Sequence, residues 1–279
     1  MIKSILATLD GSEHSQTAAR YAIWLATRLR ATVVGMHVVD VVSIEGSGAF
    51  LHDVSGSLGF EPYLDFSSKM REVLYERGRV ILEQFEASCR EHGLRADTHI
   101  ASGIVANEIC EQARTADLVV VGHRGVNERF STGLLGSTTE SVTRKCPKPV
   151  LVSPVEFREI RRPLLAYDGS QRAAAAMHEA AELATALRLP LSVLHVGKGP
   201  AADRIVDEAR RYLASHEVEA DLAIRPGHAN EVILEVMAEG DHDLLVIGAY
   251  GHSRIIEMVL GSTTEYVLRK ATAPVFLCR

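Results

Sequence analysis

The sequence has few of the residues that build metal centres and disulfide frameworks. Its four cysteines, in 279 residues, form no CxxC pair. This usage favours reduced thiols in a cytoplasmic protein. No apolar run is long enough to cross a bilayer, and the first residues enter a strand pattern directly, so we expect neither a membrane partner nor a signal peptide.

An excess of positive charge is also missing. The chain carries 30 Lys and Arg residues against 36 Asp and Glu residues, a formal net charge of −6. Nucleic acids and anionic membranes bind basic faces, so we expect no nucleic-acid partner. Aromatic residues make up only 5% of the chain, yet the apolar share of 47% is that of an ordinary globular protein with a buried core.

What the chain does contain is a long internal repeat. The block Gly136–Lys145 recurs as Gly261–Lys270, with differences only at the sixth and eighth positions. The run Asp10–Ser12, which ends an apolar segment, likewise recurs as Asp168–Ser170. A repeat this long predicts two copies of one domain.

We place the two domains at residues 1–157 and 158–279, each of ordinary domain size. The first carries an insertion, about residues 40–66, rich in glycine and serine and without a clear period, which we expect to be a loop or lid. The mixed charges of Glu156–Arg162 suggest a solvated linker between the halves.

Short apolar runs alternate with segments of helical periodicity in both halves. Expected strands include Ile2–Leu9, Thr32–Val39, Ala96–Ala101, Leu118–Gly122 and Val150–Val152, then Leu191–Val196, Glu219–Arg225, Leu244–Gly248 and Val275–Leu277. Stripes such as Ala18, Ala22, Leu25 and Leu29 predict helices with one buried face. This alternation predicts an α/β fold with a parallel sheet covered on both faces.

The glycine-rich segments suggest a phosphate site. In the second half Gly248 and Gly251 follow a strand, nine residues intervene, and Gly261–Thr263 then starts a helix. Glycines let a backbone approach a ligand closely, and a helix N-terminus attracts anions. Asp168 ends the first strand and points at the same crevice, where it could accept from ribose hydroxyls or hold a phosphate-bound Mg²⁺.

A structural interpretation of the same residues competes with this one. Glycines between a strand and a helix are common turn residues. Ser262 and Glu265 also fit a capping box, as do their counterparts Ser137 and Glu140. His37 and His195 are typical of strand-end histidines with one backbone hydrogen bond, and His123 fits either a phosphate contact or an exposed loop residue.

Taken together, the motifs resemble the tandem universal stress proteins. The resemblance rests on Asp-Gly-Ser after the first strand, His-Val in the second strand and Gly-x-x-Gly-x9-Gly-Ser after the fourth, and it covers nearly the whole chain. It implies two five-stranded parallel sheets of order 3-2-1-4-5, packed as an internal pseudo-dimer through antiparallel fifth strands. It also implies an adenine nucleotide between strands one and four.

The resemblance further implies which residues hold the nucleotide. In the second half these are Asp168 at the sugar or phosphate, Val196 at the adenine through its backbone, and Gly248, Gly251, His252, Gly261, Ser262 and Thr263 at the phosphates. In the first half the related residues are Asp10, Val38, Gly122, Gly125, Gly136, Ser137 and Thr138. The first half departs from the pattern, because ten residues rather than nine separate Gly125 from Gly136, and it is either a second site or a structural copy.

Three functions stay open on the sequence. The first is an ATP-binding stress-response regulator in which the nucleotide acts as a switch with little turnover, because no general base stands out. The second is a slow ATPase or nucleotide-dependent enzyme with the inserted loop as its lid. The third is an interaction scaffold whose glycine loops are only turns. ADP and AMP share the adenine and phosphate of ATP, and further pairing into a homodimer is left open.

Overall fold

The computed structural model, described here for residues 1–40, 63–126, 135–249 and 261–279, contains one sheet of ten strands. The strand order is β3-β2-β1-β4-β5-β10-β9-β6-β7-β8. The strands are β1 (Ser4–Thr8), β2 (Thr32–Val39), β3 (Ala96–Ser102), β4 (Leu118–Gly122), β5 (Val150–Ser153), β6 (Pro163–Ala166), β7 (Leu191–Val196), β8 (Ala220–Arg225), β9 (Leu244–Gly248) and β10 (Val275–Cys278).

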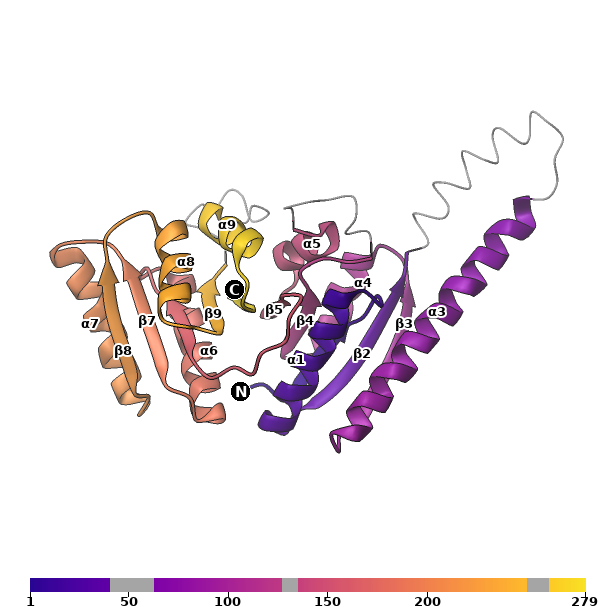
Figure 1. Ribbon diagram of the computed structural model, residues 1–279, viewed down its shortest axis with the longest axis horizontal. Helices are drawn as coiled ribbons and strands as arrows, with labels where there is room; N and C mark the ends of the chain where they lie inside the picture. The colour runs from indigo at the N-terminus through magenta and orange to yellow at the C-terminus, as the bar shows by residue number, and fades with distance from the viewer. Residues whose placement is uncertain (41–62, 127–134, 250–260) are drawn as a thin grey trace, which may run out of the picture.

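Each half has the order 3-2-1-4-5 with parallel neighbours, which confirms the expected fold. The fifth strands meet antiparallel, with Val275 opposite Val152 and Leu277 opposite Val150, which confirms the internal pseudo-dimer. Each fifth strand would otherwise be an edge with unpaired backbone groups, and this pairing joins the two halves into one sheet (Figure 1).

Helices cover both faces of the sheet. One face is covered by α1 (Glu13–Leu29), α3 (Tyr63–Glu91), α6 (Gln171–Leu187) and α7 (Pro200–Ser215). The other face is covered by α4 (Val105–Gln112), α5 (Ser137–Lys145), α8 (Ala229–Glu239) and α9 (Ser262–Lys270), with a 3-10 turn at Ala113–Thr115. Both hydrophobic clusters extend from one half into the other, so the two halves share a continuous core on each face.

The predicted helical stripes are buried. Ala18, Ala22, Leu25 and Leu29 of α1 face the sheet, as do Ala176, Ala180, Leu183 and Leu187 of α6. Ser12 is the N-cap of α1 and accepts from the Ser15 N–H, while Ser170 caps α6 in the same way through Ala173. The repeated Asp-Gly-Ser run is therefore a strand-to-helix turn that ends in a helix cap.

The inserted segment of the first half contributes a long helix to the structure. α3 begins at Tyr63, so the last residues of the expected loop 40–66 belong to this helix instead. Leu82 and Phe85 of α3 are buried in the cluster over the sheet, and its N-terminal end projects past the edge strand β3 (Figure 1). Residues 41–62, the rest of the expected lid, lie outside the described residues.

The predicted solvated linker is anchored to both halves. Ile160 is 2% exposed, and the Phe157 ring lies 4.7 Å from the Tyr21 ring. The Tyr21 hydroxyl accepts from the Arg158 N–H at 3.1 Å. The charge pattern obscured these two apolar residues, which pack inward while the charged side chains between them face the solvent.

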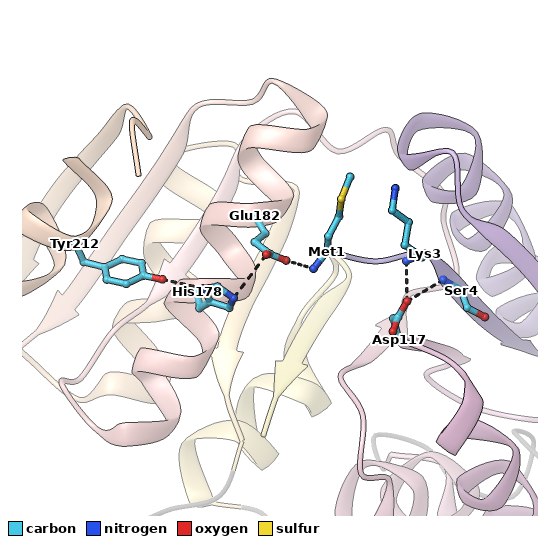
Figure 2. A network of polar contacts seen from close by, with 7 residues as sticks. All are labelled: Met1, Lys3, Ser4, Asp117, His178, Glu182 and Tyr212. Atoms are coloured by element: carbon cyan, nitrogen blue, oxygen red, sulfur yellow. Dashed lines mark hydrogen bonds and ion pairs between the residues drawn. The ribbon is translucent and has the colours of Figure 1, made fainter. Parts of the chain in front are cut away.

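Polar contacts at the amino ends of the strands follow the repeat as well. Asp117 Oδ2 accepts from the N–H groups of Lys3 and Ser4 at 2.8 and 3.0 Å (Figure 2). Asp243 accepts from the N–H groups of Arg161 and Arg162, both at 2.8 Å, at the equivalent place in the second half. In each half an aspartate before the fourth strand thus fixes the start of the first strand.

A second group of contacts in the same region joins the two halves. The Met1 amine pairs with Glu182 of α6, whose carboxylate also lies 3.6 Å from His178 Nε2 (Figure 2). His178 Nδ1 in turn contacts the Tyr212 hydroxyl of α7 at 2.8 Å. Met1 and His178 are exposed and Glu182 and Tyr212 are half-buried, so we assign these contacts a small share of the stability of the junction.

Candidate functional site

The predicted site residues converge at the carboxyl edge of the sheet in each half. Asp10 follows β1, Val38 lies near the end of β2, and Gly122 ends β4. Gly136, Ser137 and Thr138 start α5 beside them. In parallel α/β sheets this edge is where ligands bind, because strand ends and helix N-termini meet there.

Asp10 connects the first turn to the glycine loop. Its Oδ1 accepts from the Ser12 N–H at 2.9 Å and its Oδ2 from the Val126 N–H at 3.0 Å. A Cβ on Gly125 would come within 2.7 Å of Oδ2, so a side chain at this position would displace the Asp10 carboxylate. The structure therefore brings Asp10 and Gly125 together, as the site prediction requires.

The backbone of the second strand presents hydrogen-bonding groups at the carboxyl edge of the sheet in both halves. The Leu9 N–H donates to the Met36 carbonyl at 2.8 Å, on the side of β2 that β1 covers. Backbone groups two residues apart on a strand point the same way, so the N–H and C=O of Val38 point to this side, beyond the end of β1. The arrangement recurs around Val196, where the equivalent bond between Tyr167 and β7 measures 2.9 Å. These edges suit hydrogen bonds to a planar base.

The helix starts that follow the glycine loops are uncapped. Gly136 and Gly261 are the N-cap residues of α5 and α9, and no side chain caps either helix. The predicted capping box is wrong, because Glu140 pairs with Arg144 and Glu265 with Arg269 one turn later. The first N–H groups of each helix therefore lie at the carboxyl edge of the sheet without a capping carboxylate.

Exposed hydroxyl groups accompany these N–H groups. Ser137, Thr138 and Ser262 are exposed and Thr263 is half-buried in the first turns of the two helices. The next residue of the first half, Thr139, is buried and donates to the Gly122 carbonyl at 2.7 Å, which holds α5 against the end of β4. Hydroxyl donors and a positive helix end together suit phosphate oxygens.

The second half presents its aspartate differently. Asp168 is exposed, and its Oδ1 accepts from the Ser170 N–H at 2.9 Å. Gly251 and His252, two of the predicted phosphate residues, lie outside the described residues, as does most of the loop between β9 and α9. In the described part of the second half, the candidate site consists of Asp168, the Val196 backbone, Gly248 and the start of α9.

Gly122 and Gly248 allow close packing of helices on the sheet. A Cβ on Gly122 would lie 2.9 Å from the carbonyl carbon of His14 in α1. A Cβ on Gly248 would lie 2.7 Å from the carbonyl carbon of Arg172 in α6. These neighbours are backbone atoms, so neither position has space for a side chain. The two glycines bring the first turn of each helix against the end of the fourth strand.

We therefore expect Gly248→Ala to lower the free energy of unfolding by about 2–3 kcal/mol, since α6 must move to admit the methyl group. Urea unfolding followed by circular dichroism measures the change. Gly136→Ala is the control, because Gly136 has φ of −60° and its nearest neighbour would be 3.2 Å away. Its effect should stay below about 1 kcal/mol, and an equal loss in both variants would contradict this assignment.

The strand-end histidines have structural roles, as predicted. His37 Nδ1 lies 2.7 Å from the Leu9 carbonyl and His195 Nδ1 lies 2.8 Å from the Tyr167 carbonyl, and both rings are buried. His123 fits neither predicted role, because its Nε2 contacts the Leu268 carbonyl of α9 at 2.5 Å. It is a contact between the halves, visible only once β5 and β10 pair.

Arg77 is a residue that the sequence analysis missed. It lies on α3, and its guanidinium donates to the Asp10 carbonyl at 3.1 Å. Arg77 follows the inserted segment and belongs to no repeated motif. No spacing between motifs could therefore predict that Arg77 lies at the site. An exposed guanidinium at this position adds positive charge beside the turn after β1, at the carboxyl edge of the first half. Such a charge would favour an anion there.

Two other site classes receive no support from the described part of the chain. Residues 1–40, 63–126, 135–249 and 261–279 contain no group of three His, Cys, Asp or Glu side chains placed to hold a metal ion. Among the same residues, no helix combines the length and apolar character that crossing a membrane requires.

Comparison with known proteins agrees with this geometry. The model of the universal stress protein family matches residues 1–154 and again residues 159–279. A universal stress protein of Synechocystis sp. is 29% identical over 289 aligned residues, covering 100% of both chains. One from Methanocaldococcus jannaschii is 35% identical over 156 residues, 54% of this chain and 82% of the relative.

Among solved structures, a universal stress protein from Archaeoglobus fulgidus has the same fold. Its TM-score is 0.78 at 21% identity, with 99% of this chain and 98% of that chain covered. The two family matches fall on the two halves that together form the ten-stranded sheet. The chain belongs to the universal stress protein family, with two tandem domains of that family in one polypeptide.

Proposed function

We propose that this protein binds an adenine nucleotide at the carboxyl edge of each sheet half and acts as a nucleotide-dependent regulator in stress responses. The observation that carries the proposal is the convergence, in both halves, of three features on one crevice. These are an aspartate after the first strand, a backbone edge at Val38 or Val196, and an uncapped helix start.

Each feature matches one part of a nucleotide. The N–H and C=O groups of one strand residue offer a donor and an acceptor to the edge of adenine. Asp10 and Asp168 supply carboxylate oxygens for ribose hydroxyls or a phosphate-bound Mg²⁺. The starts of α5 and α9, with Ser137, Ser262 and their neighbouring threonines, offer N–H and hydroxyl donors to the phosphates.

The two halves are not equivalent as sites. In the first half the Val126 N–H of the glycine loop donates to the Asp10 carboxylate, and the Arg77 guanidinium donates to the Asp10 carbonyl. In the second half Asp168 is exposed, and its sequence keeps the nine-residue spacing between glycines. We therefore propose the second half as the principal site and the first half as a second, more enclosed one.

A switch with little turnover fits the described groups better than an enzyme. Both oxygens of Asp10 accept backbone N–H groups, and His37 and His195 are engaged with backbone carbonyls. These contacts orient the side chains for binding and leave none of these three in position to activate a water molecule. Formation of ADP above a protein-free blank, lost in Asp168→Ala, would replace the switch with a slow ATPase.

The first experiment is to denature the purified protein and separate the released small molecules by anion exchange against nucleotide standards. We expect ATP, ADP or AMP at about one or two equivalents per chain. Protein that releases none is incubated with Mg-ATP and melted. An unchanged Tm in millimolar nucleotide would overturn the proposal, because a ligand that binds only the folded state must raise the apparent stability.

A further inference from the structure

Two cysteine thiols from different segments lie in contact in the first half. Cys110 is on α4 and Cys146 directly follows α5, and their thiols hydrogen-bond to each other. Both pack in the same apolar cluster on one face of the sheet. Lys145 Nζ donates to Asn107 Oδ1 at 3.0 Å, which fastens the two helices beside the pair.

The other two cysteines are separated from this pair by the sheet. Cys89 on α3 and Cys278 on β10 belong to the cluster on the opposite face. All four thiols are unbridged in the structure. The contact between Cys110 and Cys146 is therefore the arrangement, among the four, that allows a bond to form without unfolding.

The second half shows that the fold does not need thiols at this place. Cys110 follows the buried Ile109 in α4, and Leu234 follows the buried Ile233 in α8. Cys146 ends α5 where Ala271 ends α9. Leu234 and Ala271 pack on the same cluster as the cysteines, so apolar side chains fill the equivalent positions.

The surroundings of the two sulfur atoms are unequal. The hydrogen bond with the Cys110 thiol lowers the pKa of Cys146 against the opposing effect of burial, and the Lys148 N–H and the charges of Arg279 and Lys148 lower it further. The same hydrogen bond raises the pKa of Cys110. A cysteine of lowered pKa beside one of raised pKa is the usual arrangement of an attacking and a resolving cysteine.

We propose that Cys110 and Cys146 form a dithiol site that a small hydroperoxide oxidises to an intramolecular disulfide. The Cys146 thiolate attacks one peroxide oxygen, so an S–O bond forms, the O–O bond breaks, and hydroxide leaves and takes up a proton to become water. Cys146 is then a sulfenic acid. The Cys110 sulfur loses its proton and attacks the Cys146 sulfur. The S–S bond forms, the S–O bond breaks, and a second water leaves.

The geometry favours both steps. Sulfur atoms in a disulfide lie about 2 Å apart, and the two thiols already interact with each other. Cys146 is 1% exposed while Cys110 is half-buried, an arrangement that selects a small oxidant such as hydrogen peroxide. The bond would fasten α4 to the end of α5, the helix whose first turn carries Ser137 and Thr138.

The test uses the full-length protein, reduced and then exposed to hydrogen peroxide. Titration of thiols after denaturation should fall from four to two per chain, with a mass lower by about 2 Da and a cross-linked peptide pair containing Cys110 and Cys146. Dithiothreitol should restore all four. Four thiols remaining under conditions that oxidise free cysteine, or a disulfide mapped to Cys89 or Cys278, would overturn the proposal.

Variants separate the two roles. Cys146→Ala, which copies Ala271 of the second half, should leave Cys110 reduced. Cys110→Ala should leave a sulfenic acid at Cys146 that dimedone captures. Cys89→Ala and Cys278→Ala are the matched controls, because burial raises the pKa of Cys89 to about 11 and that of Cys278 well above its usual value. Both controls should still form the disulfide, and its loss in either would contradict the assignment.

Discussion

Gly261→Val is expected to abolish nucleotide binding in the second half. Gly261 is the N-cap of α9 with φ of −58°, a conformation that valine tolerates, so the variant should fold. Its branched side chain would stand at the uncapped helix start, in the space that the proposal gives to a phosphate. Titration calorimetry with ATP should show the loss of one equivalent relative to the wild-type protein.

Two further variants sharpen this result. Gly136→Val tests the first half in the same way, although there a side chain would also press on the backbone of Arg124, 3.2 Å from the Cβ position. Tyr266→Val places a valine on the exposed side of the same helix, away from its start, and should bind like the wild type. Wild-type affinity and stoichiometry in Gly261→Val would show that the phosphates do not lie at α9.

Phe276→Ala is expected to lower the free energy of unfolding by about 3–5 kcal/mol. Phe276 is 1% exposed and lies on β10, opposite Leu151 of the first half and beside Val246 of the second. All three belong to one cluster that crosses the junction, so truncating the ring leaves a cavity between the halves. Urea unfolding with far-UV circular dichroism measures the loss.

The same unfolding curve tests whether the halves are one cooperative unit. We expect a single transition in the wild-type protein, because both faces of the junction carry continuous core. Tyr266→Ala removes an aromatic ring that is 37% exposed and should change stability by less than about 0.5 kcal/mol. Two separate transitions, or a small effect of Phe276→Ala, would show that the junction is weaker than its packing indicates.

Local patterns were sufficient for much of the fold. The alternation of apolar runs and helical stripes predicted the strands, and Asp-Gly-Ser located the turns before α1 and α6, because strand pairing and helix capping depend on residues close in sequence. The order of strands within each half came from the family resemblance. The inserted segment was expected to be a loop through residue 66, but α3 begins at Tyr63, since helix ends are weakly marked in a polar segment.

The chemistry of the candidate site was predicted only in part. The sequence singled out Asp10, Asp168 and the helix starts, and the structure brings their described members together. It did not separate a capping box from an open helix start, because Glu140 has Arg144 one turn later as a competing partner. Nor did it distinguish a glycine that contacts a ligand from one such as Gly248, which an approaching helix requires.

The sequence by itself determined that this chain is a duplicated α/β domain with an aspartate, a strand edge and a glycine-led helix start in each copy. These features are local, and the duplication repeats them. Only the tertiary structure decided which residues from distant segments meet. Arg77 reaches Asp10, His123 crosses to α9, and Cys110 contacts Cys146, because parallel strands and packed helices join segments that no spacing rule connects.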